Sequence, residues 1–156
     1  MREILFRGKA LSKSTFLKSE DGWVYGVPVP ITIDAYHTDR VEIVKCHGYD
    51  ELDCYNLLSE DDEVDPKTIG QYTGLKDKNG RKIFEGDIVK CSEPKVPADH
   101  VPILIYYENG AFMYRFARKP WAFNVAPIND VCYGLDVEEC EIIGNIHDNP
   151  ELLEVN

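Results

Sequence analysis

Alternating apolar and polar side chains are clearest over residues 103–116, where two such segments flank the dipeptide Asn109-Gly110. Asn and Gly tolerate the positive φ angles of a two-residue type I′ turn, whose twist matches that of paired strands. Because side chains alternate along a strand, this turn fixes the cross-strand neighbours. The predicted pairs are Tyr107 with Phe112, Ile105 with Tyr114 and Ile103 with Phe116 on one face, and Tyr106 with Met113 and Leu104 with Arg115 on the other.

A second dipeptide of the same kind, Asn79-Gly80, predicts another hairpin. A two-residue loop there would place Leu75 opposite Phe84 and Asp77 opposite Lys82, an apolar pair and a pair of opposite charge. The same register would also set two cations opposite each other, which a longer, bulged loop would avoid. The sequence therefore predicts the hairpin and leaves its turn open.

Further elements follow the two hairpins along the chain. Residues 85–91 predict a turn that opens a β-strand, and two prolines make residues 92–100 a loop. Residues 140–146 predict a late strand. Asn149 suits a helix N-cap and Pro150 the first helical position, so we expect one short terminal helical turn.

The first 65 residues are less regular. Short strands are predicted around residues 4–6 and 23–27, and the prolines that follow the second strand confine the next segment to a sheet edge. Apolar residues three apart give weak support for a short helix over residues 50–58. The acidic stretch 59–65 has the composition of a mobile linker.

The charge of the chain is segregated. The 156 residues carry a net charge of −11, and their 44% hydrophobic and 29% charged content is ordinary for a globular protein. Net charge is +1 over residues 1–49, −8 over 50–65, +4 over 66–119 and −8 over 120–156. This layout is that of a solvated surface, or of acidic and basic patches that meet between copies of the protein. A nucleic-acid mimic is disfavoured because the middle of the chain is basic.

The sequence predicts a cytoplasmic protein without a membrane span. No apolar run approaches the roughly 20 residues that a spanning helix needs. The first seven residues are too short and too charged for a secretory signal. Five cysteines at irregular spacing are a poor disulfide framework, so we expect free, mostly structural thiols.

Motifs for catalysis and cofactors are missing from the sequence. Cys46-His47 with Cys54, or Cys91 with His100, offers metal-binding side chains, but neither set has the short spacing of structural zinc sites. There is no Walker loop and no dinucleotide fingerprint. The sequence therefore predicts no metal, no cofactor and no catalytic residue; an enzyme whose site is assembled from scattered residues stays a third alternative.

Three segments resemble the YopX family. They are residues 68–89, which contain Thr68-Ile69-Gly70-Gln71-Tyr72-Thr73-Gly74 and run through the first predicted hairpin, residues 2–7, and residues 143–153. The resemblance implies a phage or prophage origin, an SH3-like β-barrel portion, self-association and no enzymatic activity. The expected fold is mainly β, with an N-terminal lobe at 1–65 that ends in the acidic linker 50–65, a barrel core at 66–149 and a tail at 150–156.

The leading hypothesis is a non-enzymatic interaction protein that assembles as a homo-oligomer and contacts a phage or host protein. The alternative is a weak nucleic-acid-binding small-barrel module, which the net charge disfavours. Turn geometry explains Gly70, Gly74, Gly80, Gly86 and Asp87. Turn geometry explains Gln71 and Tyr72 less easily, and aromatic and basic side chains on or after the second hairpin could complete the core, a subunit interface or a binding surface. The predicted contact surface comprises Gln71, Tyr72, Tyr106, Met113, Arg115, Arg118 and Trp121.

Overall fold

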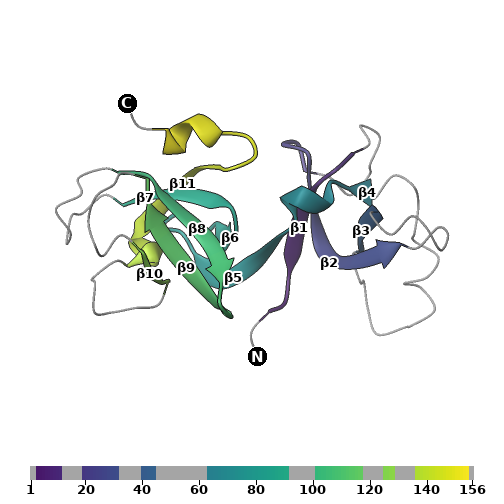
Figure 1. The fold of residues 1–156 in the computed structure, drawn as a ribbon, viewed down its shortest axis with the longest axis horizontal. Coiled ribbons are helices and arrows are strands. Elements are labelled where there is room, and N and C mark those ends of the chain that lie inside the picture. The colour runs from purple at the N-terminus through teal and green to yellow at the C-terminus, as the bar shows by residue number, and fades with distance from the viewer. Residues whose placement is uncertain are drawn as a thin grey trace. The chain divides into compact units, whose positions relative to one another are not determined.

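The computed structural model describes residues 3–11, 19–31, 40–44, 63–91, 101–117, 125–128 and 136–154. In these ranges the regular elements are β-strands and short 3-10 turns, with no α-helix, and the predicted mainly-β class is confirmed. The strands form two antiparallel sheets, in the order β4-β3-β2-β1-β5-β6 and β10-β9-β8-β7-β11. The chain divides into two compact units, residues 1–72 and 73–156 (Figure 1).

The bounds of the elements are as follows. The strands are β1 (Phe6–Lys9), β2 (Trp23–Ile31), β3 (Arg40–Val44), β4 (Glu63–Val64), β5 (Gly70–Lys76), β6 (Lys82–Phe84), β7 (Asp87–Cys91), β8 (Ile103–Glu108), β9 (Ala111–Phe116), β10 (Val125–Pro127) and β11 (Cys140–Asn145). The 3-10 turns are η2 (Pro66–Thr68), η4 (Val137–Glu139) and η5 (Pro150–Leu153).

In the first unit the long strand β2 pairs with two other strands, one along its first part and one along its second. Its first part pairs with β1, from Lys9 opposite Trp23 to Phe6 opposite Gly26. Its second part, which contains both prolines, pairs with β3 from Val27 onward. A proline has no N–H to give to a ladder, and so this segment needs a partner on one side only, as the sequence predicts.

The core of the first unit forms where β2, β3 and β4 meet. Val24, Ile43 and Val64 are fully buried there. Gly8 allows β1 to approach them, because a Cβ at this position would lie 2.9 Å from Cγ2 of Val64. The close approach explains why a residue without a side chain stands inside β1.

The end of the predicted acidic linker is ordered. Glu63 and Val64 form β4 and pair with β3. The Asp65 side chain accepts a hydrogen bond from the Lys67 backbone N–H at 3.0 Å and caps η2. The linker prediction is therefore wrong for residues 63–65, while the predicted helix at 50–58 lies outside the described residues. The division between the units falls after residue 72, because the first residues of β5 pair with β1.

In the second unit the β8–β9 hairpin has the predicted register at every pair. Asn109 and Gly110 have φ angles of 52° and 82°, as a type I′ turn requires. The inner face of this sheet carries the core. Its buried members are Ile83, Val89, Ile103, Ile105, Phe112, Tyr114, Ala126, Ile128, Val137 and Cys140.

The β5–β6 hairpin takes the longer of the two turns that the sequence allows. The Asp77 N–H donates to the Arg81 carbonyl at 2.8 Å, and the Gly80 N–H donates to the Asp77 carbonyl at 2.8 Å. Gly80 has a φ of 80°, which completes a three-residue loop with a bulge. Of the two open alternatives the longer loop is the one observed, and Asp77 lies opposite Arg81 rather than Lys82.

The predicted late strand is observed as β11, and the predicted terminal turn is the 3-10 turn η5 (yellow in Figure 1). The Asn149 side chain does not cap η5. A Cβ at Gly144 would lie 2.9 Å from Cδ1 of Leu152, so η5 packs closely on β11 at this glycine. No described ladder joins β10 to β11, and closure into an SH3-like barrel stays a prediction.

Candidate functional site

The outer face of the β8–β9 hairpin carries three of the predicted contact residues. Tyr106 on β8 lies opposite Met113 on β9, and both are half-buried. Arg115 is exposed two residues further along β9, and its guanidinium lies 5.8 Å from the centroid of the Tyr106 ring. The structure thus brings an aromatic, a thioether and a cation together on one accessible sheet face.

Tyr106 keeps its proton at neutral pH. Burial raises the pKa of its phenol, the Glu108 carboxylate raises it further, and the Arg115 charge opposes both only in part. A neutral phenol beside a guanidinium can both donate and accept a hydrogen bond. This face can therefore bind a partner through apolar area, one fixed positive charge and one hydroxyl.

The other predicted contact residues lie elsewhere. Gln71 and Tyr72 belong to the first unit, where Gln71 pairs with Phe6 and the Tyr72 N–H donates to the Leu5 carbonyl at 2.8 Å. Gln71 is half-buried, and Tyr72 is only 5% exposed. Arg118 and Trp121 lie outside the described residues.

Asp77 is a polar centre whose cross-strand partner depends on the turn that the sequence leaves open. Its side chain is fully buried, although Arg81 beside it is half-exposed. Oδ1 accepts the backbone N–H groups of Asn79 and Arg81, each at 2.9 Å. Oδ2 accepts the Arg81 guanidinium at 2.9 Å and the Ile142 backbone N–H at 3.2 Å. One carboxylate therefore shapes its own turn and binds strand β11.

Asp77 remains ionised in spite of its burial. Burial alone would raise the pKa of this carboxyl, but the hydrogen bonds from Arg81, Ile142 and Asn79 outweigh it and lower the pKa. Outside this centre, Lys78 Nζ forms an ion pair with Glu141 at 2.8 Å and lowers the pKa of that exposed carboxyl. Both carboxylates carry their charge at neutral pH.

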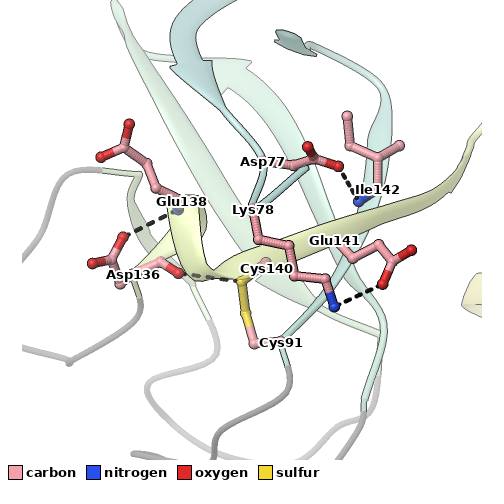
Figure 2. The surroundings of a disulfide bond; sticks show 8 residues. All are labelled: Asp77, Lys78, Cys91, Asp136, Glu138, Cys140, Glu141 and Ile142. Atoms are coloured by element: carbon pink, nitrogen blue, oxygen red, sulfur yellow. Dashed lines mark hydrogen bonds and ion pairs between the residues drawn. A yellow bond between two sulfur atoms is a disulfide. The ribbon is translucent and has the colours of Figure 1, made fainter. Parts of the chain in front are cut away.

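The turn at residues 77–81 binds the edge of β11 at which another strand could otherwise pair (Figure 2). The Ile142 N–H donates to Asp77. The Ile142 carbonyl accepts from Arg81 Nη2 at 2.7 Å. Two residues before Ile142 in β11, the Cys140 carbonyl accepts the Lys78 N–H at 2.9 Å. These backbone groups would otherwise form an open sheet edge, so the turn protects the edge of β11. We call this arrangement the Asp77 clasp; it comprises Asp77, Lys78, Arg81, Cys140 and Ile142.

Two of the cysteines form a disulfide. Cys91 ends β7, Cys140 begins β11, and the two residues are cross-strand neighbours whose Cα atoms are 4.0 Å apart (Figure 2). The expectation of free thiols is therefore wrong for this pair. The two residues are 49 positions apart, and only the pairing of β7 with β11 brings them together. The other three cysteines lie outside the described residues.

The motif segments around Gly86 and Asn145 support each other. The Gly86 carbonyl accepts the Ile146 N–H at 2.9 Å, and Asn145 pairs with Asp87. Asp87 is buried and accepts the Phe84 N–H at 2.8 Å. The side-chain oxygen of Asn145 accepts the backbone N–H groups of His147 and Asp148, each at 3.0 Å, in the turn that follows β11. These contacts give the motif residues roles in the fold.

Within the described ranges, no three histidine, cysteine, aspartate or glutamate side chains gather in a way that could hold a metal ion. No helix in those ranges is long and apolar enough to cross a membrane.

These features define a small, mainly-β protein of two antiparallel units, with an aromatic and cationic sheet face and a disulfide in the second unit. The chain belongs to the YopX family, because the family model described as YopX protein matches residues 17–154. Residues 2–7 lie outside that match. No curated protein matches the chain.

A solved structure offers a further comparison. The chain is similar to protein EF1440 from Enterococcus faecalis, with 27% sequence identity and a TM-score of 0.48. The similarity covers 99% of this chain and 100% of that one.

Proposed function

We propose that the chain is a non-enzymatic interaction protein of a phage or prophage, which acts in the host cytoplasm and associates with copies of itself. The observation that carries the proposal is the separation of exposed charge within the second unit. Residues 73–91 carry five cations and three acids, whereas residues 136–154 carry seven acids and no lysine or arginine.

Lys78 and Arg81 already meet Glu141 within the chain, at 2.8 Å and 3.9 Å, whereas the remaining exposed charges lie on separate segments. Asp77 and Asp87 are buried, which leaves the cationic side chains of β5–β7 dominant at the surface. Among the described residues of this unit, the other exposed cations are Lys76, Lys90 and Arg115, and the exposed acids from residue 136 onward are Asp136, Glu138, Glu139, Asp148, Glu151 and Glu154. Opposite charges on separate segments favour contacts between copies and steer them together.

The surface proposed for this contact is the outer face of β8–β9. Tyr106 and Met113 supply apolar area, and Arg115 supplies the charge that an acidic segment of another copy would meet. Tyrosine, methionine and arginine are enriched at the centres of protein interfaces. A second copy is therefore the occupant that this face fits.

The proposal includes an SH3-like barrel as the scaffold of the second unit. Ile83 of β6 and Leu75 of β5 pack on the inner face of the five-stranded sheet. The Asp77 clasp then binds β11 at the edge that a closed barrel would protect with a ladder. Packing and clasp together support a barrel in which side chains complete the closure.

Sedimentation of the purified protein over a concentration series tests the proposal. We expect association at low ionic strength, where the Debye length is about 30 Å, and dissociation where it is about 3 Å. Arg115→Glu should weaken association, and Lys67→Glu, the same charge change at an exposed position of the first unit, should leave it unchanged. A monomer under every condition would exclude self-association, and equal effects of both variants would exclude the surface.

The contact between Arg115 and Tyr106 also favours a second candidate, a weak binder of single-stranded nucleic acid. Such proteins stack bases on exposed aromatic rings beside cationic groups. Binding to a fluorescent oligonucleotide should then fall steeply with salt and weaken in Arg115→Ala. Absence of binding at low salt would exclude this function.

A further inference from the structure

Cys91 and Cys140 lie at a position of the β7–β11 ladder where side chains approach most closely. The backbone groups of Cys140 and Ile142 face the Asp77 clasp, away from β7. Because these groups alternate in direction along a strand, Cys140 and Cys91 form a non-hydrogen-bonded pair. Their side chains therefore share one face of the sheet and meet directly, with 4.0 Å between the Cα atoms.

The two sulfurs have different surroundings. Cys140 is fully buried in the core of the second unit, whereas Cys91 is only partly buried. The carbonyl oxygen of Asp136 lies 3.3 Å from Sγ of Cys140 (Figure 2). An incoming thiol can therefore reach Cys91 more easily than Cys140. A thiol formed at Cys140 would find a hydrogen-bond acceptor already in place.

We propose that Cys91 is a site of reversible modification by low-molecular-weight thiols, with Cys140 as the resolving cysteine. A thiolate RS⁻ attacks Sγ of Cys91, the S–S bond breaks, and a mixed disulfide Cys91–S–S–R forms while Cys140 leaves as a thiolate. Cys140 takes a proton from solvent and donates it to the Asp136 carbonyl oxygen. No net oxidation occurs in this exchange, because one disulfide replaces another.

The reverse reaction regenerates the original bond. The Cys140 thiolate attacks Sγ of Cys91 in the mixed disulfide and releases RS⁻. A second RS⁻ that attacks the R sulfur instead gives two protein thiols and R–S–S–R. In that full reduction the protein disulfide gains two electrons and the two RS⁻ supply them.

The fold allows β11 to stay in place while the bond is open. The Cys140 carbonyl still accepts the Lys78 N–H, and Ile142 stays bound to Asp77 and Arg81. The ladder with β7 holds the opposite edge of β11. Opening the disulfide therefore loosens one end of the strand without releasing it, as a reversible modification requires.

Reduced glutathione is the probe for the test. The oxidised, full-length protein is treated with limiting glutathione, free thiols are blocked with iodoacetamide, and the peptides are analysed by mass spectrometry. Cleavage after Lys90 and Lys95 gives a peptide whose one cysteine is Cys91. We expect the glutathione adduct on that peptide and the blocking group on Cys140. Equal adducts on both cysteines, or an adduct mainly on Cys140, would overturn the assignment.

Two variants and one spectrum complete the test. With oxidised glutathione, Cys140→Ser should accumulate a stable adduct on Cys91, and Cys91→Ser should react at Cys140 more slowly. Equal rates would contradict the difference in access. The circular dichroism spectrum of the reduced wild-type protein should stay that of the folded state, and its loss on reduction would overturn the reversible site.

Discussion

The two hairpins of the second unit contain the same Asn-Gly dipeptide and form different turns. Asn109-Gly110 makes a two-residue loop in which both residues have positive φ. Asn79-Gly80 belongs to a three-residue loop in which only Gly80 does. In the first case an aromatic and aliphatic ladder on both strands sets the register. In the second case the Asp77 carboxylate sets it.

The comparison shows that residues flanking a turn decide its type. The Asp77 side chain accepts N–H groups at residues 79 and 81, which stabilises the longer loop. At the equivalent place in the other hairpin, Glu108 is exposed and pairs with Ala111 across the strands. A short carboxylate that can reach back into its own turn therefore outweighs the preference of Asn-Gly for a two-residue loop.

The largest difference between the two hairpins should appear in the free energy of unfolding when the carboxylate that flanks each turn is removed. Asp77→Ala leaves the Ile142 N–H and the Arg81 guanidinium without their acceptor, and we expect a loss of about 3 kcal/mol in the free energy of unfolding. Glu108→Ala, an exposed position, should change it by no more than about 0.5 kcal/mol. Urea titrations of both variants check this, and equal losses would contradict the assigned role of Asp77.

Acid should weaken the β5–β6 turn in particular. The pKa of Asp77 is lowered from 3.8 in the folded protein, so its stabilisation is fully present above pH 3.8 and is lost as the pH falls through the folded value. In Asp77→Asn this part of the acid dependence should disappear. Denaturant midpoints measured as a function of pH test the point, and an unchanged acid slope in the variant would count against it.

The two asparagines should differ more modestly. Asn109 has a φ of 52°, and alanine in that conformation costs about 1 kcal/mol. Asn79 does not have a positive φ, and Asn79→Ala should stay within about 0.5 kcal/mol of wild type. Thermal unfolding of the two single variants makes the comparison, which the reverse order of stability would refute.

The smallest effect concerns the ion pair between the Lys78 and Glu141 side chains. Lys78 lowers the pKa of Glu141, mainly through its hydrogen bond and charge, so Lys78→Met should move that pKa back towards 4.5. Lys76→Met, a matched change two residues earlier, should leave it where it is. Carboxyl chemical shifts followed through a pH titration measure both, and a shift of equal size in the control would deny the pairing.

The β8–β9 hairpin could be predicted to the residue because its register depends on local alternation, which the sequence displays. The choice between the two β5–β6 turns could not, since the Ile142 N–H that Asp77 binds lies 65 positions along the chain. For the same reason the Cys91–Cys140 bond escaped prediction: its partners meet only through the β7–β11 pairing. Tyr106, Met113 and Arg115 could be placed on one sheet face because they alternate on a hairpin whose register the sequence predicts.

Amide hydrogen exchange in Asp77→Ala tests most directly whether the Asp77 clasp, rather than a ladder, holds the outer edge of β11. The Ile142 N–H faces Asp77, whereas alternation turns the Glu141 N–H towards β7. Loss of a hydrogen bond to a charged acceptor is worth about 1.5–3 kcal/mol, so exchange at Ile142 should accelerate roughly tenfold or more relative to Glu141. An equal acceleration at both amides, or none at Ile142, would contradict the account.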